Sequence, residues 1–505
     1  MKFLKLLFNK TFIVILACIV QIGITLAVGI FLNEYFYQFW AISFAISLIL
    51  FLFVVNRRDI PETKLLWTVI LLPFPFFGII MYLTFSHRRL PKKHAKKMEQ
   101  SLNEIDGFLP APDVNAGKNA CGSDYGISQY LSRYSKTNGD AFSKTTYFSS
   151  GEEWLSDLME EIRKAEKFIF MEFFILSLGQ MWDEILSALR EKAKEGVEVR
   201  IIYDDLGSLG RVPSSYFKKL RAEGIGCVKF NPIYPIFSAI YNNRDHRKIV
   251  VIDGNVGYTG GANIGDEYIN KTQRFGHWKD SVIKIRGGAV FALTKMFLSV
   301  FDGIKNEQSD YNKYFPQNPQ LYENGEYVHC FGDGPKPFDD ENIGENNFIN
   351  IITNAKKYVY ITTPYLIPTY NLICALKNAV ARGVDVRIVT PAIPDKRIIF
   401  CCTRSHYRQL LDAGVKIYEY TPGFVHSKLA VADDRVAFVG TINMDFRSLL
   451  HHFECGVDII GGDSVIDIKK DVKSVIDVSK DMCDFKMNGF VSLLCSVLKI
   501  FFPLL

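Results

Sequence analysis

Two stretches of the chain, 180 residues apart, repeat one pattern of reactive and turn-forming residues. The first reads HRKIVVIDGNVGYTGGAN over residues 246–263, and the second reads HSKLAVADDRVAFVGTIN over residues 426–443. A single match to H-x-K-x4-D in a chain of 505 residues has odds of roughly one in twenty-five from composition, and the repeat with its added Gly and Asn makes chance negligible. The matched positions are His246, Lys248, Asp253, Gly260 and Asn263 in the first copy, and His426, Lys428, Asp433, Gly440 and Asn443 in the second.

The residue types in this pattern indicate phosphodiester chemistry. The His and Lys of each copy alternate along a predicted strand, so both side chains project from one face. The imidazole attacks phosphorus and the ammonium holds a nonbridging oxygen, while Asn263 and Asn443 add neutral donors for the phosphate. Two copies supply two imidazoles, one as nucleophile and one as proton donor to the leaving alkoxide. Each copy is therefore half of a site, and we expect no metal or cofactor, because Lys and Asn supply the electrostatic stabilisation.

Asp253 and Asp433 complete the motif, but each closes a strand just before a turn. Aspartate side chains commonly hold the backbone of turns through hydrogen bonds. We therefore interpret both as structural support for the motif rather than as acids in the chemistry.

The similarity between the two copies extends upstream through a whole α/β unit. KFIFMEFFIL (residues 167–176) matches KYVYITTPYL (residues 357–366), and EGVEVRI (residues 195–201) matches RGVDVRI (residues 382–388). Strands alternate with helices in both copies, which predicts mainly parallel or mixed sheets with helices on their faces. The fold class is therefore α/β, with two duplicated α/β-sandwich domains.

The predicted domain boundaries follow from this repeat and from composition. We expect a membrane module, a polar linker, a first α/β domain, a second linker, a second α/β domain and an apolar tail. Their predicted ranges are 1–100, 101–140, 141–305, 306–340, 341–486 and 487–505.

Three apolar stretches without charged residues lie in the membrane module, over about residues 11–32, 36–55 and 65–86. Each has about the twenty residues needed to cross a bilayer core. The third carries Pro73 and Pro75 near its middle, which is typical of a broken or re-entrant segment.

Basic residues around these stretches indicate the orientation. If the first two stretches span and the third returns to its side of entry, all twelve flanking Lys and Arg residues lie on one side; three full spans divide them six against six. We therefore predict two spans and a re-entrant or interfacial third, with a cytoplasmic catalytic region, and three plain spans is the alternative. Six of these charges, between residues 88 and 97, also suit an anionic leaflet, where each contributes on the order of 1 kcal/mol.

The bulk composition limits the other function classes. Net charge is +5, from 59 basic and 54 acidic residues, without the concentrated basic face that is usual for nucleic-acid binding. The ten cysteines contain no C-x-x-C spacing, which argues against a zinc ribbon or thioredoxin-type site and predicts reduced thiols.

With these motifs the chain resembles the phospholipase D superfamily and, within it, the bacterial cardiolipin synthases. The resemblance covers nearly the full length and includes GIIMYLTFSHRR (residues 78–89), AKEGVEVRIIYDDLGS (residues 193–208), YEYTPGFVHSK (residues 418–428) and GTINMDFRS (residues 440–448). It implies two halves about a pseudo-twofold axis, with both motifs in one site. It also implies that two phosphatidylglycerol molecules are joined into cardiolipin, with release of glycerol, through a covalent phosphohistidine.

The resemblance further implies an acid that orients the His of the opposite half. The matching positions are Asp280 in HWKD and Glu454 in HFEC, which sets Glu454 on His246 and Asp280 on His426. By analogy His246 is the nucleophile and His426 the general acid, although the near symmetry of the two halves leaves their order open.

The chain departs from the family pattern at positions 261, 441 and 452, and at the second of these Thr441 replaces the usual Ser. The widespread G-S-x-N form is replaced by Gly-Gly in the first copy, so Gly261 lacks a hydroxyl and we expect one donor to the phosphate oxygens to come from the backbone. His452 stands where many relatives have Asn. We interpret His451 and His452 as surface or structural residues, with a role in the site as the alternative.

Two apolar segments outside the module also bear on the substrate. NPIYPIFSAIY (residues 231–241) is either a packed loop or a membrane-dipping lip beside the site. The tail over residues 490–505 is predicted to be an interfacial helix or a packed terminus.

Three other functions use the same features. A hydrolytic phospholipase D shares the phosphohistidine, so the motifs cannot separate water from an alcohol acceptor. A nuclease of the superfamily would be expected to be soluble, with a basic track and stacking aromatics. A non-enzymatic scaffold would be expected to have lost a motif His or Lys, and all four are present.

Overall fold

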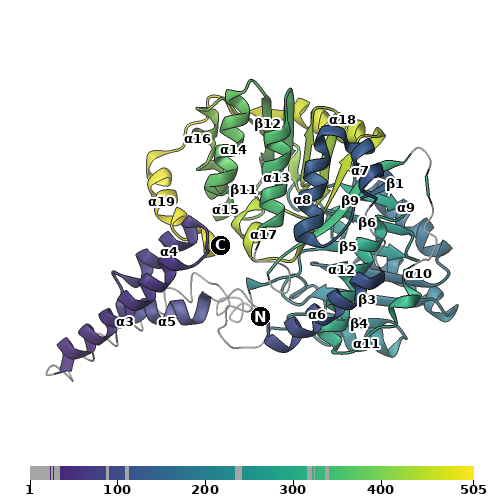
Figure 1. The fold of residues 1–505 in the computed structure, drawn as a ribbon, viewed down its shortest axis with the longest axis horizontal. Helices are drawn as coiled ribbons and strands as arrows, with labels where there is room; N and C mark the ends of the chain where they lie inside the picture. The colour runs from purple at the N-terminus through teal and green to yellow at the C-terminus, as the bar shows by residue number, and fades with distance from the viewer. Residues whose placement is uncertain are drawn as a thin grey trace. The chain divides into compact units, whose positions relative to one another are not determined.

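The computed structural model describes Gly23, Ala27 and residues 35–86, 90–108, 113–233, 242–315, 321–322, 325–335 and 341–504. The chain divides into two compact units (Figure 1). One combines residues 1–87, 235–239 and 496–505, and the other contains residues 88–234 and 240–495.

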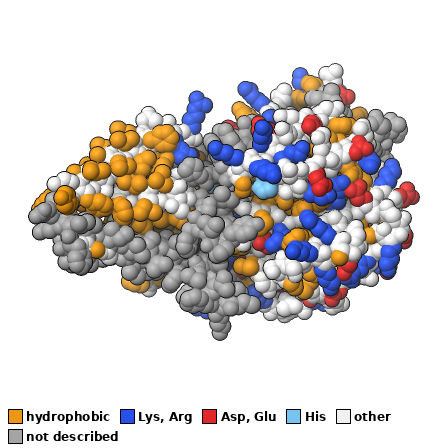
Figure 2. All heavy atoms as spheres, turned by 90° about the horizontal axis from the view of Figure 1, so that it is seen from below, with side chains coloured by type: hydrophobic (Ala, Val, Ile, Leu, Met, Phe, Trp, Pro, Cys, Tyr) orange, Lys and Arg blue, Asp and Glu red, His pale blue; other side chains and the backbone are white. Residues whose placement is uncertain are grey.

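The first unit holds the predicted membrane segments. Helix α3 (Phe36–Asn56) is long and apolar enough to cross a membrane, as expected for residues 36–55, and it alone meets that test among the described residues. The predicted span over residues 11–32 lies outside the described residues, apart from Gly23 and Ala27. Large apolar side chains on α3 are exposed, and hydrophobic side chains gather on the described part of this unit in the view of Figure 2.

The third apolar stretch is broken, as Pro73 and Pro75 predict. It forms α4 (Pro61–Leu71) and α5 (Pro75–Phe85), separated by three residues. Each proline lacks a backbone donor, so the chain cannot continue one helix through this point. With eleven residues each, neither helix has the length of about twenty that a span requires.

Fifteen strands of the second unit form one mixed sheet, in the order β19-β13-β12-β10-β15-β16-β18-β9-β1-β8-β6-β5-β2-β3-β4. The first half supplies β1 (Asp140–Phe148), β2 (Phe168–Phe173), β3 (Glu198–Asp204), β4 (Gly226–Phe230), β5 (Lys248–Ile252), β6 (Val256–Gly260), β7 (His277–Lys279), β8 (Val282–Arg286), α9 (Gly151–Lys164), α10 (Gln180–Lys194), α11 (Tyr216–Ala222) and α12 (Val290–Lys305). The second half supplies β9 (Glu326–Asp333), β10 (Tyr358–Thr362), β11 (Leu366–Ile367), β12 (Asp385–Pro391), β13 (Lys416–Tyr420), β14 (Gly423–Val425), β15 (Leu429–Ala432), β16 (Val436–Gly440), β17 (Met444–Asp445), β18 (Glu454–Ile460), β19 (Ser479–Asp481), α13 (Ile343–Asn354), α14 (Tyr370–Ala381), α15 (Arg397–Arg404), α16 (Tyr407–Leu411), α17 (Phe446–Leu450) and α18 (Asp463–Asp477).

The strand order repeats the duplication seen in the sequence. Read outward from the centre, β1-β8-β6-β5-β2-β3-β4 corresponds to β9-β18-β16-β15-β10-β12-β13. The central strands β1 and β9 pair antiparallel, as two equivalent strands related by a twofold axis must. The motif strands β5 and β15 therefore take equivalent places in the sheet.

The predicted linkers differ from the structure. Helices α6 (Lys92–Ile105), α7 (Val114–Cys121) and α8 (Tyr125–Ser135) occupy much of residues 101–140, and β9 lies inside residues 306–340. Leu131 of α8 and Val328 of β9 are fully buried. Short amphipathic helices rich in Gly and Asn resemble a loop by composition, but burial of one apolar face stabilises them.

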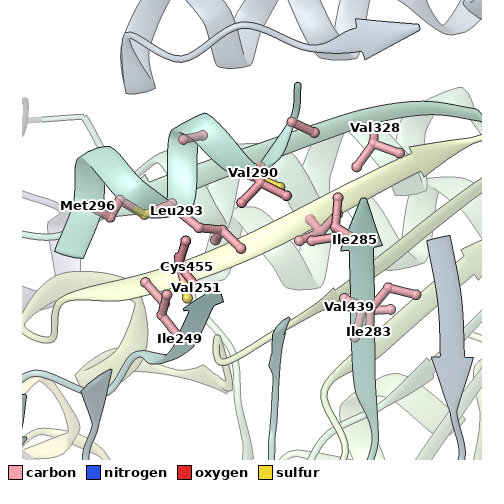
Figure 3. Packing of buried hydrophobic residues seen from close by; sticks show 14 of the residues in the cluster. Ile249, Val251, Ile283, Ile285, Val290, Leu293, Met296, Val328, Val439 and Cys455 are labelled. Atoms are coloured by element: carbon pink, nitrogen blue, oxygen red, sulfur yellow. The ribbon is translucent and has the colours of Figure 1, made fainter. Parts of the chain in front are cut away.

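Both halves contribute to one hydrophobic core. Helix α12 packs Val290, Leu293 and Met296 against the sheet. Figure 3 shows the labelled residues of β8 near Val328 and Val439 of the second half, and those of β5 near Cys455 of the second half. The two halves thus form a single compact unit, which holds their motifs in a fixed relation.

Candidate active site

Each motif histidine is anchored by its backbone to the opposite half. The N–H of His246 donates to the carbonyl of Phe453 at 2.8 Å, and the N–H of His426 donates to the carbonyl of Lys279 at 2.7 Å. Strand β14, just before His426, also pairs in parallel with β7 of the first half. These contacts bring each histidine beside the acid that follows the accepting carbonyl.

The two predicted cross-contacts between histidine and acid are both present. Nδ1 of His246 lies 2.9 Å from Oε2 of Glu454, and Nδ1 of His426 lies 2.7 Å from Oδ2 of Asp280. Both carboxylates are fully buried. With Nδ1 directed at a carboxylate, Nε2 is the ring nitrogen left for a substrate.

Burial and neighbouring cations keep both imidazoles neutral at pH 7. Burial lowers the pKa of His246 well below its usual value, and the positive charges of Lys248 and Lys428 act in the same direction. Burial and Lys428 lower the pKa of His426 to about 4, against the opposing effect of Asp280. Because His246 responds to groups of the other half, the two motifs share one electrostatic environment.

The motif lysines are buried beside their histidines. Nζ of Lys248 and Nζ of Lys428 each donate to the carbonyl of the histidine two residues earlier. Burial lowers the pKa of Lys248 to about 8 and that of Lys428 to about 7, partly opposed by Glu454 and Asp280. Two desolvated ammonium groups attract an anion such as a phosphate strongly.

The two asparagines are held inside their own halves. Oδ1 of Asn263 accepts from the N–H of Ile175 and its Nδ2 donates to the Tyr268 hydroxyl, both at 3.0 Å. Nδ2 of Asn443 donates to Oγ of Ser448 at 3.0 Å. Each amide nitrogen keeps a second hydrogen, so contact with a phosphate oxygen remains a prediction for both.

Asp253 and Asp433 bind backbone. The carboxylate of Asp253 accepts three consecutive N–H groups, from residues 166–168, each at 2.8 Å. That of Asp433 accepts the N–H groups of residues 356–358 at 2.7–2.9 Å. Both aspartates have positive φ, 52° and 55°, in the turn after the motif strand. Each carboxylate therefore holds the start of the strand that neighbours its motif strand.

The backbone donor expected in place of a side-chain hydroxyl stays a prediction, but it is not Gly261 itself. Its N–H donates to the carbonyl of Ser281 at 2.9 Å, because the chain here continues the pairing of β6 with β8. The equivalent Thr441 makes the same backbone contact, to the carbonyl of Cys455 at 2.9 Å, and its hydroxyl donates to Glu454. In the first half, Nε1 of Trp278 supplies the corresponding hydrogen bond, to Asp280 at 3.2 Å.

His451 and His452 are not surface residues, and whether they are structural or belong to the site stays a prediction. Both side chains are buried. The ring of His452 lies 5.4 Å from that of His246, between centroids, and its Nδ1 lies 3.5 Å from Oε1 of Glu454. The backbone of Phe453 pairs with residues 244–246, and this places the neighbouring His452 beside His246. In the sequence, the position of His452 directly before Phe453 and Glu454 is the signal that could have placed it near the site.

The roles predicted for the two apolar segments, residues 231–241 and 490–505, stay predictions. Residues 234–241 of the stretch 231–241 lie outside the described residues. The tail contains a short apolar helix, α19 (Gly489–Lys499), with exposed Phe490, Leu493 and Val497.

Comparison with known proteins identifies relatives along most of the chain. The family model "Cardiolipin synthase, PLD-like domain" matches residues 158–275 and 348–476, and "Phospholipase_D-nuclease N-terminal" matches residues 45–86. An uncharacterized protein of Streptococcus mutans is 42% identical over 85% of this chain and 93% of its own. A cardiolipin synthase of Halalkalibacterium halodurans is 36% identical over 88% of this chain and 90% of its own. The structure of a phosphatidylserine synthase from Haemophilus influenzae covers 76% of this chain and 100% of its own, with a TM-score of 0.58 and 15% identity, which is a likeness of fold.

Proposed function

The chain belongs to the family of cardiolipin synthases with phospholipase D-like domains, and we propose that it joins two phosphatidylglycerol molecules into cardiolipin with release of glycerol. The proposed enzyme is therefore a phosphatidyltransferase, and its substrate is a phospholipid rather than nucleic acid. The observation that supports the proposal most is the pair of contacts His246–Glu454 and His426–Asp280, because they join two half-motifs into one two-histidine site.

The first step forms the phosphohistidine. Nε2 of His246 attacks the phosphorus of the donor lipid, a P–N bond forms, and the P–O bond to glycerol breaks. Glu454 holds the Nδ1 proton and stabilises the positive ring. Lys248 and Lys428 hold nonbridging oxygens. The donor phosphate raises the pKa of His426 from its low value in the free protein, so that this ring can protonate the departing glycerol oxygen.

The second step transfers the phosphatidyl group to the acceptor. His426, now neutral, takes the proton of the acceptor's glycerol hydroxyl. The hydroxyl oxygen attacks phosphorus, a P–O bond forms, the P–N bond breaks, and His246 is regenerated. Water in place of the acceptor gives phosphatidic acid, which is the hydrolytic alternative.

The chain is a membrane protein, by its family and by helix α3. For its topology we propose spans at residues 11–32 and 36–55, a third segment at 65–86 that enters and leaves on one side, and a cytoplasmic catalytic unit. Two observations support this arrangement: the break between α4 and α5, and the single side that it gives to all twelve flanking basic residues.

The proposed activity is tested with membranes that contain the protein and phosphatidylglycerol labelled in its glycerol headgroup and acyl chains. We expect labelled cardiolipin and free glycerol in equal molar amounts. Phosphatidic acid as the sole lipid product would contradict the synthase function and support hydrolysis. Cleavage of labelled DNA in a parallel reaction would support a nuclease.

The order of the histidines is tested with His246→Asn and His426→Asn. We expect both variants to lose cardiolipin synthesis. A labelled phosphoenzyme should accumulate in His426→Asn and be absent from His246→Asn. The matched control is His277→Asn, whose ring contacts the Tyr420 hydroxyl outside the two motifs. The reverse pattern of labelling would exchange the two roles.

A further inference from the structure

The residue two positions before each acid differs between the halves. In the first half it is Trp278, whose ring lies 5.1 Å from that of His426 and whose Nε1 donates to Asp280. In the second half it is His452, at 5.4 Å from the His246 ring. Indole has a single N–H and no lone pair to offer, whereas imidazole has a second nitrogen that can bind a cation. The duplication is therefore chemically unequal at this position.

The imidazole of His452 is buried without hydrogen-bond partners. Its side chain is 7% exposed, and neither Nδ1 nor Nε2 makes a hydrogen bond. Oε1 of Glu454, 3.5 Å from that Nδ1, is also buried without a hydrogen-bond partner. Buried polar atoms left unpaired cost free energy unless a ligand satisfies them. The unpaired atoms of both residues face the same small region beside His246.

We propose that His246, His452 and Glu454 form a binding site for a transition-metal dication of the Zn²⁺ type, and that the bound ion inhibits the enzyme. One ligand atom from each residue lies within 4.8 Å of the others. A tetrahedral Zn²⁺ with bonds of about 2.0–2.2 Å places its ligand atoms roughly 3.4 Å apart. Side-chain movements of about 1 Å therefore complete the site, and a fourth position remains open for water.

The ligand types select the ion. Two imidazoles and one carboxylate suit Zn²⁺, Co²⁺ or Ni²⁺, while Mg²⁺ and Ca²⁺ require more oxygen ligands. Nδ1 of His246 is 2.9 Å from Glu454, so an ion bound between them displaces the Nδ1 proton, and the neutral ring takes the tautomer that carries its proton on Nε2. Nε2 then has no lone pair with which to attack phosphorus, so the bound ion blocks the nucleophile. The opposite histidine has no such site, because Trp278 cannot serve as a ligand.

Metal binding is measured directly on the purified, tag-free full chain in detergent, without substrate. We expect one equivalent of Co²⁺ to bind, with the visible absorption of tetrahedral coordination, and Zn²⁺ to displace it. His452→Asn and His452→Trp, the latter copying the first half, should each weaken binding more than about tenfold. His451→Asn is the matched control and should bind as the parent does. Equal binding by the parent and both position-452 variants would overturn the site, as would no binding by the parent.

Inhibition of phosphatidyl transfer is measured in a second experiment. Because metal binding is measured without catalysis, a failure of the metal site is distinguishable from a failure of the proposed function. Zn²⁺ should abolish phosphatidyl transfer by the parent, and a chelator should restore it, while Mg²⁺ at the same concentration should have no such effect. The residual activity of His452→Asn should need more than about tenfold more Zn²⁺ for half inhibition. Binding at this site with unchanged transfer would overturn the inhibitory role.

Discussion

Gly261 and Thr441 hold the same place in the two motifs but serve their acids differently. Thr441 donates a hydroxyl to Glu454, whereas a Cβ at position 261 would lie 2.0 Å from Oδ1 of Asp280. The shorter acid of the first half thus occupies the space that a side chain would fill. Glycine is required here by this close approach, and the Trp278 indole takes over the hydroxyl's hydrogen bond.

Gly261→Ala is accordingly expected to lower phosphatidyl transfer by about 100-fold, because the new methyl displaces Asp280 from His426 by an ångström or so. Thermal unfolding should show that the variant still folds. The control is Gly126→Ala, where a Cβ meets no atom within 4 Å. Full activity in Gly261→Ala would show that the Asp280–His426 contact is dispensable.

The pH dependence of activity is set by the two motif lysines. Burial lowers the pKa of Lys428 to about 7 and that of Lys248 to about 8 in the free protein. Since the protonated forms bind phosphate, kcat/KM should be highest below about pH 7 and fall as pH rises through 7 to 8, far below the usual lysine range near 10.5.

Initial rates at limiting lipid across pH 6–10 measure this profile. In Lys428→Arg, the loss of kcat/KM that comes from deprotonation of residue 428 should move to higher pH, because a guanidinium stays charged throughout this range. The different shape of the guanidinium should lower the maximum rate. A profile that stays flat up to about pH 9.5 would be inconsistent with buried, easily deprotonated lysines.

At the scale of elements, α4 and α5 form a tight helical pair in the membrane module. A Cβ at Gly78 of α5 would lie 2.7 Å from the carbonyl oxygen of Ile70 and from the Cα of Leu71, at the end of α4. Trp67 and Tyr82 pack edge to face across the same pair, with centroids 5.1 Å apart. The proline break turns the chain, and the glycine lets the two helices touch.

Gly78→Val should therefore push α4 and α5 apart and destabilise the module by about 1–3 kcal/mol, the usual effect of overpacking. The measurement is the melting temperature of the full chain in detergent. Ile80→Val, at an exposed position of the same helix, is the control. An unchanged melting temperature for Gly78→Val would mean that the helices separate without cost.

At the scale of the whole molecule, the site depends on both halves being present in one chain. The β1–β9 pair and the shared core hold the halves together, and each motif histidine takes its acid from the other half. One catalytic unit thus needs two intact motifs, each with its own role.

Mixing His246→Asn with His426→Asn protein should therefore leave cardiolipin synthesis at the background of either variant alone. The assay is labelled cardiolipin formation in mixed detergent micelles, with an equal mixture of parent and His246→Asn as the control for mixing. Recovery of activity in the mixture of inactive variants would indicate that the motifs assemble between chains.

The sequence by itself determined the local features. Periodicity and the doubled motif predicted the α/β class, the duplication, the four reactive His and Lys residues and the break at Pro73 and Pro75, because each depends on residues near one another in the chain. The family pattern pointed to Asp280 and Glu454 as the acids beside the histidines.

Only the tertiary structure decided what depends on distant contacts. It joined the two halves into one sheet, converted the expected linkers into packed helices and a central strand, and brought His452 against His246. It also showed that the Gly261 N–H is already bonded in the sheet. Burial and strand pairing set these outcomes, and they join segments far apart in the chain, which composition and spacing do not record.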